Sequence, residues 1–121
     1  MKKNKLLIIL LGSLVFFSHC ETAFESDLAG KKPILQSPSN NLTTTTTSQT
    51  FYWEKMNGAS TYQLQVVSPT FNSITTLIAD TTITTNRFTI ILSHGDYQWR
   101  VKANNSGSSS DFSETWNLKI Q

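Results

Sequence analysis

The sequence is poor in the residues that build disulfides, metal sites and phosphate-binding loops. It has a single cysteine, Cys20, so no disulfide can form within the chain. Of its two histidines only His94 lies beyond Cys20, and its acids are isolated along the chain, so metal-ligand spacing is absent. Its five glycines do not form a glycine-rich phosphate-binding loop. These shortages predict a protein without a metal ion or a cofactor.

Positive charge is scarce once the first residues are set aside. The chain has ten Lys and Arg residues against eight Asp and Glu residues, but Lys2, Lys3 and Lys5 precede the first apolar run. Without these three lysines, seven cations face eight acids, which is a side-chain charge of −1. Nucleic-acid binding needs a basic stripe or cluster, and none remains. The sequence therefore predicts no nucleic-acid partner.

The longest apolar run, residues 6–17, is short for a permanent membrane span. Its twelve residues compare with the about 20 that a transmembrane helix needs. A cationic stub, residues 1–5, precedes the run, and this order of charge and apolar residues is typical of a secretory signal peptide. The sequence thus predicts a signal peptide over residues 1–19.

The residues that follow the run, Phe17-Ser18-His19-Cys20, resemble the lipobox of bacterial lipoproteins. Phe17 stands where leucine is commoner in that family, and His19 stands where a small residue is expected. The resemblance implies that a peptidase cuts before Cys20 and that its thiol and new amino group carry acyl chains, which anchor a protein stably. It also implies a cell-envelope protein, in the bacterial outer membrane, on the periplasmic or the exposed face. The alternative is that Cys20 is an incidental thiol in a leader that is cut elsewhere.

Residues 20–31 are expected to form a flexible tether behind the lipidated Cys20. The segment is polar, carries acids at Glu21, Glu25 and Asp27, and has no clear periodicity. Such a segment cannot bury enough apolar area to offset its ordering entropy. Residues 32–121 are enough for one small domain with one core.

The domain is predicted to be all-β, because apolar residues recur at a two-residue period and never at a sustained helical one. Turn signals divide it into seven short strands, which predicts a seven-stranded antiparallel sandwich. Asn57-Gly58 indicates a turn that pairs the strands on either side of it. In residues 73–85 the period breaks at Leu77-Ile78, so the register there stays unassigned. The inward residues are expected to be Phe51, Trp53, Tyr62, Leu64, Val66, Phe88, Ile90, Leu92, Tyr97, Trp99, Val101, Trp116, Leu118 and Ile120.

From about residue 32 to residue 121 the sequence resembles the fibronectin type III family, whose fold is immunoglobulin-like. The resemblance rests on Trp53, on the run "YQLQV" and on the pattern of alternating residues in "LSHGDYQWRVKA". It implies that Tyr97 forms a tyrosine corner, in which its hydroxyl bonds to upstream backbone. The resemblance implies no particular function, because the same fold serves adhesion modules, receptor ectodomains and spacers.

The sequence argues against an enzyme. Its most catalytic-looking cluster, Ser93-His94-Gly95-Asp96, has the residue types of a serine triad. Triads are assembled from separated segments, and adjacent residues in a tight turn cannot easily align a nucleophile, a base and a carboxylate. We therefore interpret the cluster as a turn and assign no catalytic residue.

Loops are the candidate binding elements. Loops 56–60 and 104–111 are expected at one end of the sandwich, and their composition suits adaptable hydrogen bonding or a solvated connector equally. Loop 104–110, being long and polar, is expected to contribute little to stability. Two rings near these loops could stack on a sugar or a peptide. The candidate ligand-binding residues are Asn57, Gly58, Asn104, Asn105, Ser106, Tyr52 and Phe112.

The sequence is compatible with three non-catalytic functions for the anchored domain. The first is a binding or adhesion module for an envelope or extracellular protein. The second is a structural spacer or an accessory subunit of an envelope complex. The third is a carbohydrate-binding module, which would need a platform of exposed aromatic rings.

Overall fold

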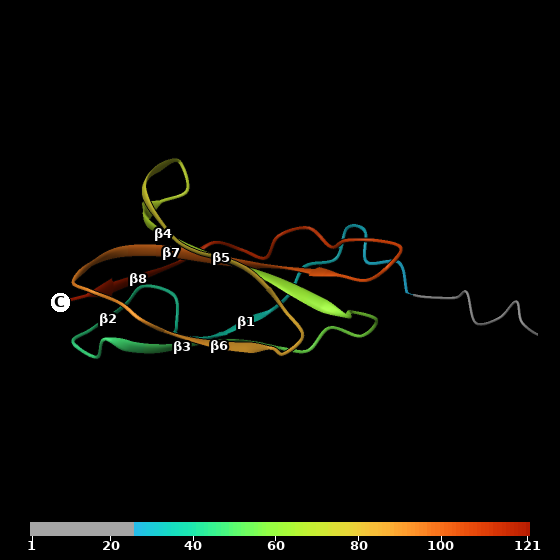
Figure 1. Cartoon of the computed structure of the whole chain (residues 1–121), viewed down its shortest axis with the longest axis horizontal. Helices are drawn as coiled ribbons and strands as arrows, with labels where there is room; N and C mark the ends of the chain where they lie inside the picture. The colour runs from blue at the N-terminus through green and yellow to red at the C-terminus, as the bar shows by residue number, and fades with distance from the viewer. Residues whose placement is uncertain (1–25) are drawn as a thin grey trace, which may run out of the picture.

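The structure is a computed structural model that describes residues 26–121, and its strands form two facing sheets (Figure 1). One sheet has the order β1-β3-β6 and the other β2-β8-β7-β4-β5. No helix in the described part of the chain is long or apolar enough to cross a membrane. The strands are β1 (Leu35–Ser37), β2 (Leu42–Thr44), β3 (Ser48–Trp53), β4 (Thr61–Thr70), β5 (Ser73–Ile83), β6 (Arg87–Ile91), β7 (Gly95–Asn104) and β8 (Trp116–Ile120).

The predicted all-β sandwich is confirmed, but it has eight strands where seven were predicted. The additional strand is β2, which runs parallel to β8, so the sheets are not wholly antiparallel. Asn41 adopts a positive φ of 66° immediately before β2 and turns the chain toward β8. Of the three β2 residues, Leu42 alone packs against the core, and it is only partly buried. So short a strand has almost no hydrophobic pattern by which the sequence could reveal it.

The turn at Asn57-Gly58 does not form the predicted hairpin. Strand β3 pairs with β1 and β6, whereas β4 pairs with β5 and β7 in the opposite sheet. The chain crosses between the sheets here because both flanking strands direct large rings into one core. The rings of Trp53 and Tyr62 meet there edge to face, with their centroids 5.6 Å apart.

The core contains every residue predicted to point inward. Eleven of them are buried, and Phe88, Ile90 and Trp116 pack partly buried against the cluster. Phe51 meets Trp99 edge to face at 5.0 Å, an arrangement in which aromatic pairs are favourable. The alternation of the strands therefore accounts for the inner layer.

Residues 26–31, which the sequence assigns to the tether, pack on the domain. Leu28 is fully buried and belongs to the core cluster. Its backbone N–H donates to Ser108 Oγ at 3.0 Å, and the N–H of Asp111 donates to the carbonyl of Lys31 at 2.8 Å. The domain thus begins at least as early as Ser26, because one buried leucine and a few hydrogen bonds hold this otherwise polar segment against the sandwich.

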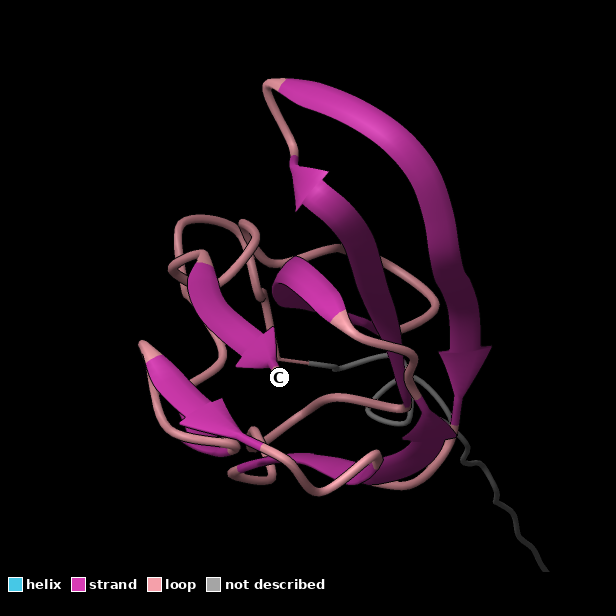
Figure 2. Ribbon diagram, turned by 90° about the vertical axis from the view of Figure 1, so that its left-hand side faces the viewer, coloured by secondary structure: helices cyan, strands magenta, loops and turns pink. Residues whose placement is uncertain are grey.

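The β4–β5 hairpin extends beyond the body of the sandwich (Figure 2). The register shifts between Val66, which pairs with Ala79, and Val67, which pairs with Leu77, so Ile78 is the extra residue of a β-bulge. This is the place where the sequence period breaks. The hairpin bends over the outer face of its own sheet, where the N–H of Phe71 donates to Gln98 Oε1 at 2.9 Å.

Candidate functional site

The turn with the residue types of a triad serves the fold. The Tyr97 hydroxyl donates to the carbonyl of Ser93 at 2.7 Å, so the predicted tyrosine corner is present. The carboxylate of Asp96 pairs with Lys119 Nζ at 3.1 Å. Within residues 26–121 no group of three or more His, Cys, Asp or Glu side chains could hold a metal ion.

Loops 56–60 and 104–111 lie together at one end, as predicted. The N–H of Ser60 donates to the carbonyl of Asn104 at 2.8 Å. The side-chain amide of Asn105 donates both to the carbonyl of Gly58, at 3.1 Å, and to the carbonyl of Ser26, at 2.7 Å. The two loops therefore bond to each other and contact the start of the described N-terminal segment (Figure 1).

The side chains of loop 104–111 are largely occupied within the protein. Asn105 Oδ1 accepts bonds from the backbone of Gly107 and from the backbone and hydroxyl of Ser108, at 2.7–3.0 Å. Asn104 Oδ1 accepts from Ser109 Oγ at 2.7 Å. Among the predicted ligand-binding residues of these loops, Asn57, Gly58 and Ser106 are exposed. The internal bonds favour the connector interpretation for Asn104 and Asn105.

Two serines, Ser110 near the end of this loop and Ser113 just beyond it, replace a strand partner for β7. Ser110 Oγ accepts from the backbone N–H of Ala103 at 2.8 Å, and Ser113 Oγ accepts from that of Val101 at 2.9 Å. Their own N–H groups return bonds to the carbonyls of the same two β7 residues. A buried N–H without a partner is costly, so this part of the loop contributes more to stability than its composition predicts.

The two rings proposed for stacking already have cations on them. The guanidinium of Arg87 lies 5.0 Å from the ring centroid of Tyr52. The ring centroid of Phe112 lies 4.1 Å from the Arg100 guanidinium and 4.6 Å from Lys102 Nζ. Tyr52 is on β3 and Phe112 follows β7, in opposite sheets, so the two rings do not form one platform.

A ladder of alternating rings and cations covers the outer face of β7. Phe71, from the hairpin tip, lies 4.0 Å from the Arg100 guanidinium, which contacts Phe112 in turn. Arg100 Nε donates to Gln65 Oε1 at 2.9 Å. Burial lowers the pKa of Arg100, and the carboxylate of Asp80 partly offsets this. Arginine stays charged at neutral pH regardless. The ladder ties the hairpin to the β7–β8 loop.

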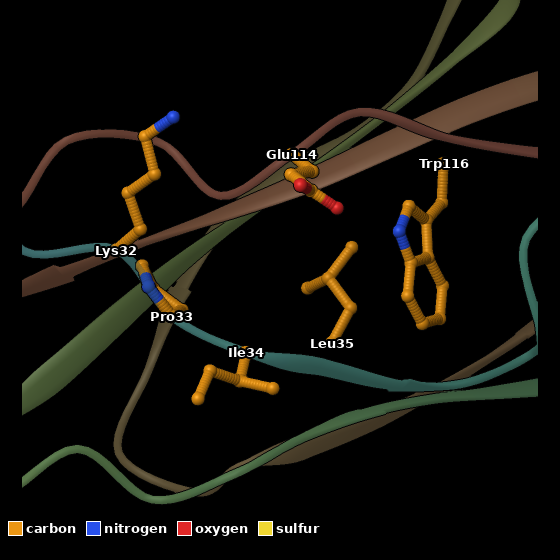
Figure 3. Close-up of a pocket in the computed structure, with 6 residues that line it drawn as sticks. All are labelled: Lys32, Pro33, Ile34, Leu35, Glu114 and Trp116. Carbon is orange, nitrogen blue, oxygen red and sulfur yellow. The ribbon is translucent and has the colours of Figure 1, made fainter.

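A concave site lies between β1 and the beginning of β8 (Figure 3). This lateral cleft has a volume of about 260 Å³ and is lined by Lys32, Pro33, Ile34, Leu35, Glu114 and Trp116. Figure 3 shows Leu35 rising from β1 toward the Glu114 carboxylate and the indole of Trp116. Trp116 is only partly buried, and its ring meets Trp99 edge to face at 5.9 Å.

Sequence reasoning missed the lateral cleft because it counted Trp116 only as a core residue. One signal was available: Glu114 and Trp116 are two residues apart at the start of a strand, and residues at this spacing share a face. A carboxylate and an indole on one face are an unusual pair for a core. Alternation alone does not tell which inward ring remains accessible from the side.

Solved structures with the same fold are fibronectin type III domains. No family model matches the sequence, and no curated protein matches it. A human fourth FNIII domain aligns with a TM-score of 0.55 and 18% identity, covering 90% of this chain and 88% of that domain. The fibronectin type III domain of human fibronectin type III domain containing protein 3 aligns with a TM-score of 0.52 and 18% identity, covering 82% of this chain and 91% of that domain. An Fn3-like protein from Clostridium thermocellum aligns with a TM-score of 0.50 and 20% identity, covering 77% of this chain and 90% of that protein's chain.

These similarities and the tyrosine corner define the described residues as a fibronectin type III-like domain. At identities of 18–20% they establish the fold alone. One fold of this kind hosts many functions, so function depends on the sites of the individual chain.

Proposed function

We propose that this protein is a lipid-anchored cell-envelope lipoprotein whose fibronectin type III-like domain is a non-catalytic binding or adhesion module. The observation that supports a binding role is the lateral cleft, where an indole, a carboxylate and apolar side chains converge beside β1. Convergent polar groups in an apolar concavity are the usual form of a binding site. The expected partner is an envelope or extracellular protein.

The position of Ser26 determines which end of the domain an anchor at Cys20 would hold near the membrane. Cys20 lies outside the described residues, and its lipidation remains a prediction. Six residue steps separate Cys20 from Ser26, a distance of at most about 20 Å in an extended chain. The loop end would then face the lipid, and the lateral cleft and the hairpin would remain accessible.

Fatty-acid labelling in a Gram-negative host tests the anchor. The wild-type chain should incorporate the probe and fractionate with the envelope, whereas Cys20→Ser should do neither. Equal labelling of the two proteins would rule out the lipoprotein proposal and leave the domain proposal standing.

Site-specific photo-crosslinking in intact cells tests the binding role. A photoreactive residue in place of Glu114 should form adducts, while one in place of Thr89, an exposed residue of β6 outside the cleft lining, should not. Adducts at both positions in equal yield would indicate collisions without a specific partner.

An accessory-subunit function is the second candidate, because the projecting hairpin carries exposed apolar side chains. Ile74 is 51% exposed and Leu77 is 57% exposed, both on β5. Exposed apolar residues that cluster on one element are typical of protein contact surfaces. Crosslinks from a photoreactive residue at position 77, without crosslinks from position 114, would favour this function.

A further inference from the structure

We propose that the lateral cleft binds a lysine or arginine side chain presented by an extended polypeptide segment, which adds as a strand to the open edge of β1. The proposal rests on the binding function argued above and specifies its site and the chemistry of its partner. Its elements are the Glu114 carboxylate, the Trp116 ring, the size of the cleft and the β1 edge.

The Glu114 carboxylate is available to a cation. The Lys119–Asp96 pair is the only ion pair among residues 26–121, and Glu114 is exposed and has no ion-pair partner there. Lys32 also lines the lateral cleft, but in Figure 3 its ammonium group stands apart from the Glu114 carboxylate and the Trp116 indole. Charge complementarity therefore favours a basic group over an acidic one.

Trp116 provides an aromatic wall beside this carboxylate. Its ring contacts Trp99 edge to face, and its indole N–H makes no hydrogen bond within the described part of the chain. Tryptophan is the most favourable ring for a cation–π contact. A cation placed between Glu114 and Trp116 would thus gain both an ion pair and a ring contact.

The size and lining of the lateral cleft suit one side chain. Its volume of about 260 Å³ lies below the about 300–1,000 Å³ of typical small-molecule pockets. Pro33, Ile34 and Leu35 form an apolar wall along it. Lysine and arginine bury an aliphatic stem on such a wall while their charged ends reach polar groups.

The edge of β1 favours a segment in extended conformation. Within the described residues β1 pairs with β3 alone, so its other edge is open beside the lateral cleft. A peptide that adds to a sheet edge bonds through its main chain, and its alternate side chains enter pockets. A single basic side chain would thereby specify the partner, while the backbone would supply the other contacts.

The test follows the three indole N–H signals of the ¹⁵N-labelled full chain, with Cys20→Ser, in detergent micelles by NMR. The probe is a blocked peptide of about seven alternating threonine and valine residues with lysine at its centre. Comparison peptides carry glutamine or glutamate there. The Trp116 signal, identified by its loss in Trp116→Phe, should shift most on titration. The signal of Trp99, whose ring contacts Trp116, should shift less, and that of Trp53 should stay.

Charge-matched variants show whether Glu114 recognises the cation. Glu114→Gln should weaken binding of the lysine peptide about tenfold. Asp111→Asn removes the same charge from an exposed residue outside the cleft lining and should change affinity less than about twofold. Lys32→Ala should preserve or strengthen binding, because it removes a like charge. Unchanged Trp53 and Trp99 signals show that each variant is folded.

Several results would overturn the proposal. Equal affinity for the lysine and glutamine peptides would show that the cleft does not recognise a cation, and preference for glutamate would assign recognition to Lys32. Shifts only at signals remote from Trp116 would place binding elsewhere, which removes the cleft proposal but not the binding function. If no peptide caused a shift but position 114 still formed crosslinks in cells, the cleft proposal would be overturned and the binding function would stand.

Discussion

The side-chain amide of Asn105 donates to the carbonyl of Ser26 at 2.7 Å, across 79 positions of sequence. Because Ser26 lies only six residues after Cys20, this bond joins the loop end of the domain to the segment that leads to the proposed anchor. Loop 104–111 therefore holds the N-terminal segment in place. Its polar side chains have a structural function before any recognition is assigned to them.

Gly58→Ala should displace the docked segment. A Cβ at Gly58, where φ is +90°, would overlap the Cβ of Ser26, whereas one at Gly30, where φ is +79°, meets nothing within 4 Å. Both alanines incur the strain of a positive φ, about 1–2 kcal/mol. Gly58→Ala should therefore lower the unfolding free energy of a 26–121 fragment by at least about 1 kcal/mol more than Gly30→Ala in urea melts. Equal costs would mean that the segment is not held against this turn.

Leu28→Ala should destabilise the same fragment by about 2–4 kcal/mol, because it leaves a cavity in the core. Leu28 is fully buried, whereas Leu77, the matched control, is 57% exposed. Leu77→Ala should stay within about 0.5 kcal/mol of the parent in the same urea melts. A Leu28→Ala cost as small as that of the control would restore the tether prediction for residues 26–31.

The sequence predicted the inner layer well because burial in a sandwich follows a two-residue period. Phe51, Leu64, Val101 and the other alternating residues are therefore where the pattern puts them. Pairing between strands depends on long-range packing. The sequence therefore predicted the turn at Asn57-Gly58 correctly, but the strands on either side of it do not pair with each other. Leu28 was missed because one leucine in a polar segment has no period.

The candidate site was harder to predict than the fold. The shared loop end followed from topology, but the partners of Asn105 depend on where Ser26 and Gly58 lie in space. The covering of Phe112 required both Arg100 and Lys102 to lie against its ring, and the sequence specifies only that both point outward. Side-chain partners across sheets and loops are set by three-dimensional packing, which single-sequence patterns do not encode.

Tyr97→Phe should lower the unfolding free energy by about 1–3 kcal/mol, because the partly buried bond from the Tyr97 hydroxyl to the Ser93 carbonyl is lost. Tyr52→Phe is the control, since Tyr52 interacts through its ring with Arg87 and its hydroxyl makes no bond among the described residues. Urea midpoints of the two variants should therefore separate. Coinciding midpoints would show that the tyrosine corner contributes nothing measurable to stability.

Arg100→Gln should loosen the hairpin more than it destabilises the domain. The Arg100 guanidinium lies 4.0 Å from Phe71 and 4.1 Å from Phe112, and each such contact is worth about 0.5–1 kcal/mol at partly exposed sites. The hairpin tip depends on this ladder and on the bond from Phe71 N–H to Gln98 Oε1, whereas the main core lies on the other face of the sheet.

Native-state hydrogen exchange would resolve this difference. The amide of Phe71 should exchange about fivefold to thirtyfold faster in Arg100→Gln, in keeping with about 1–2 kcal/mol, while the β7 amides that pair with β8 keep their protection. Arg87→Gln removes a cation from the single ring of Tyr52 on the opposite sheet and should leave the Phe71 amide unaffected. If the Phe71 amide exchanged equally fast in both variants, the hairpin would be held by its backbone bonds and not by the ladder.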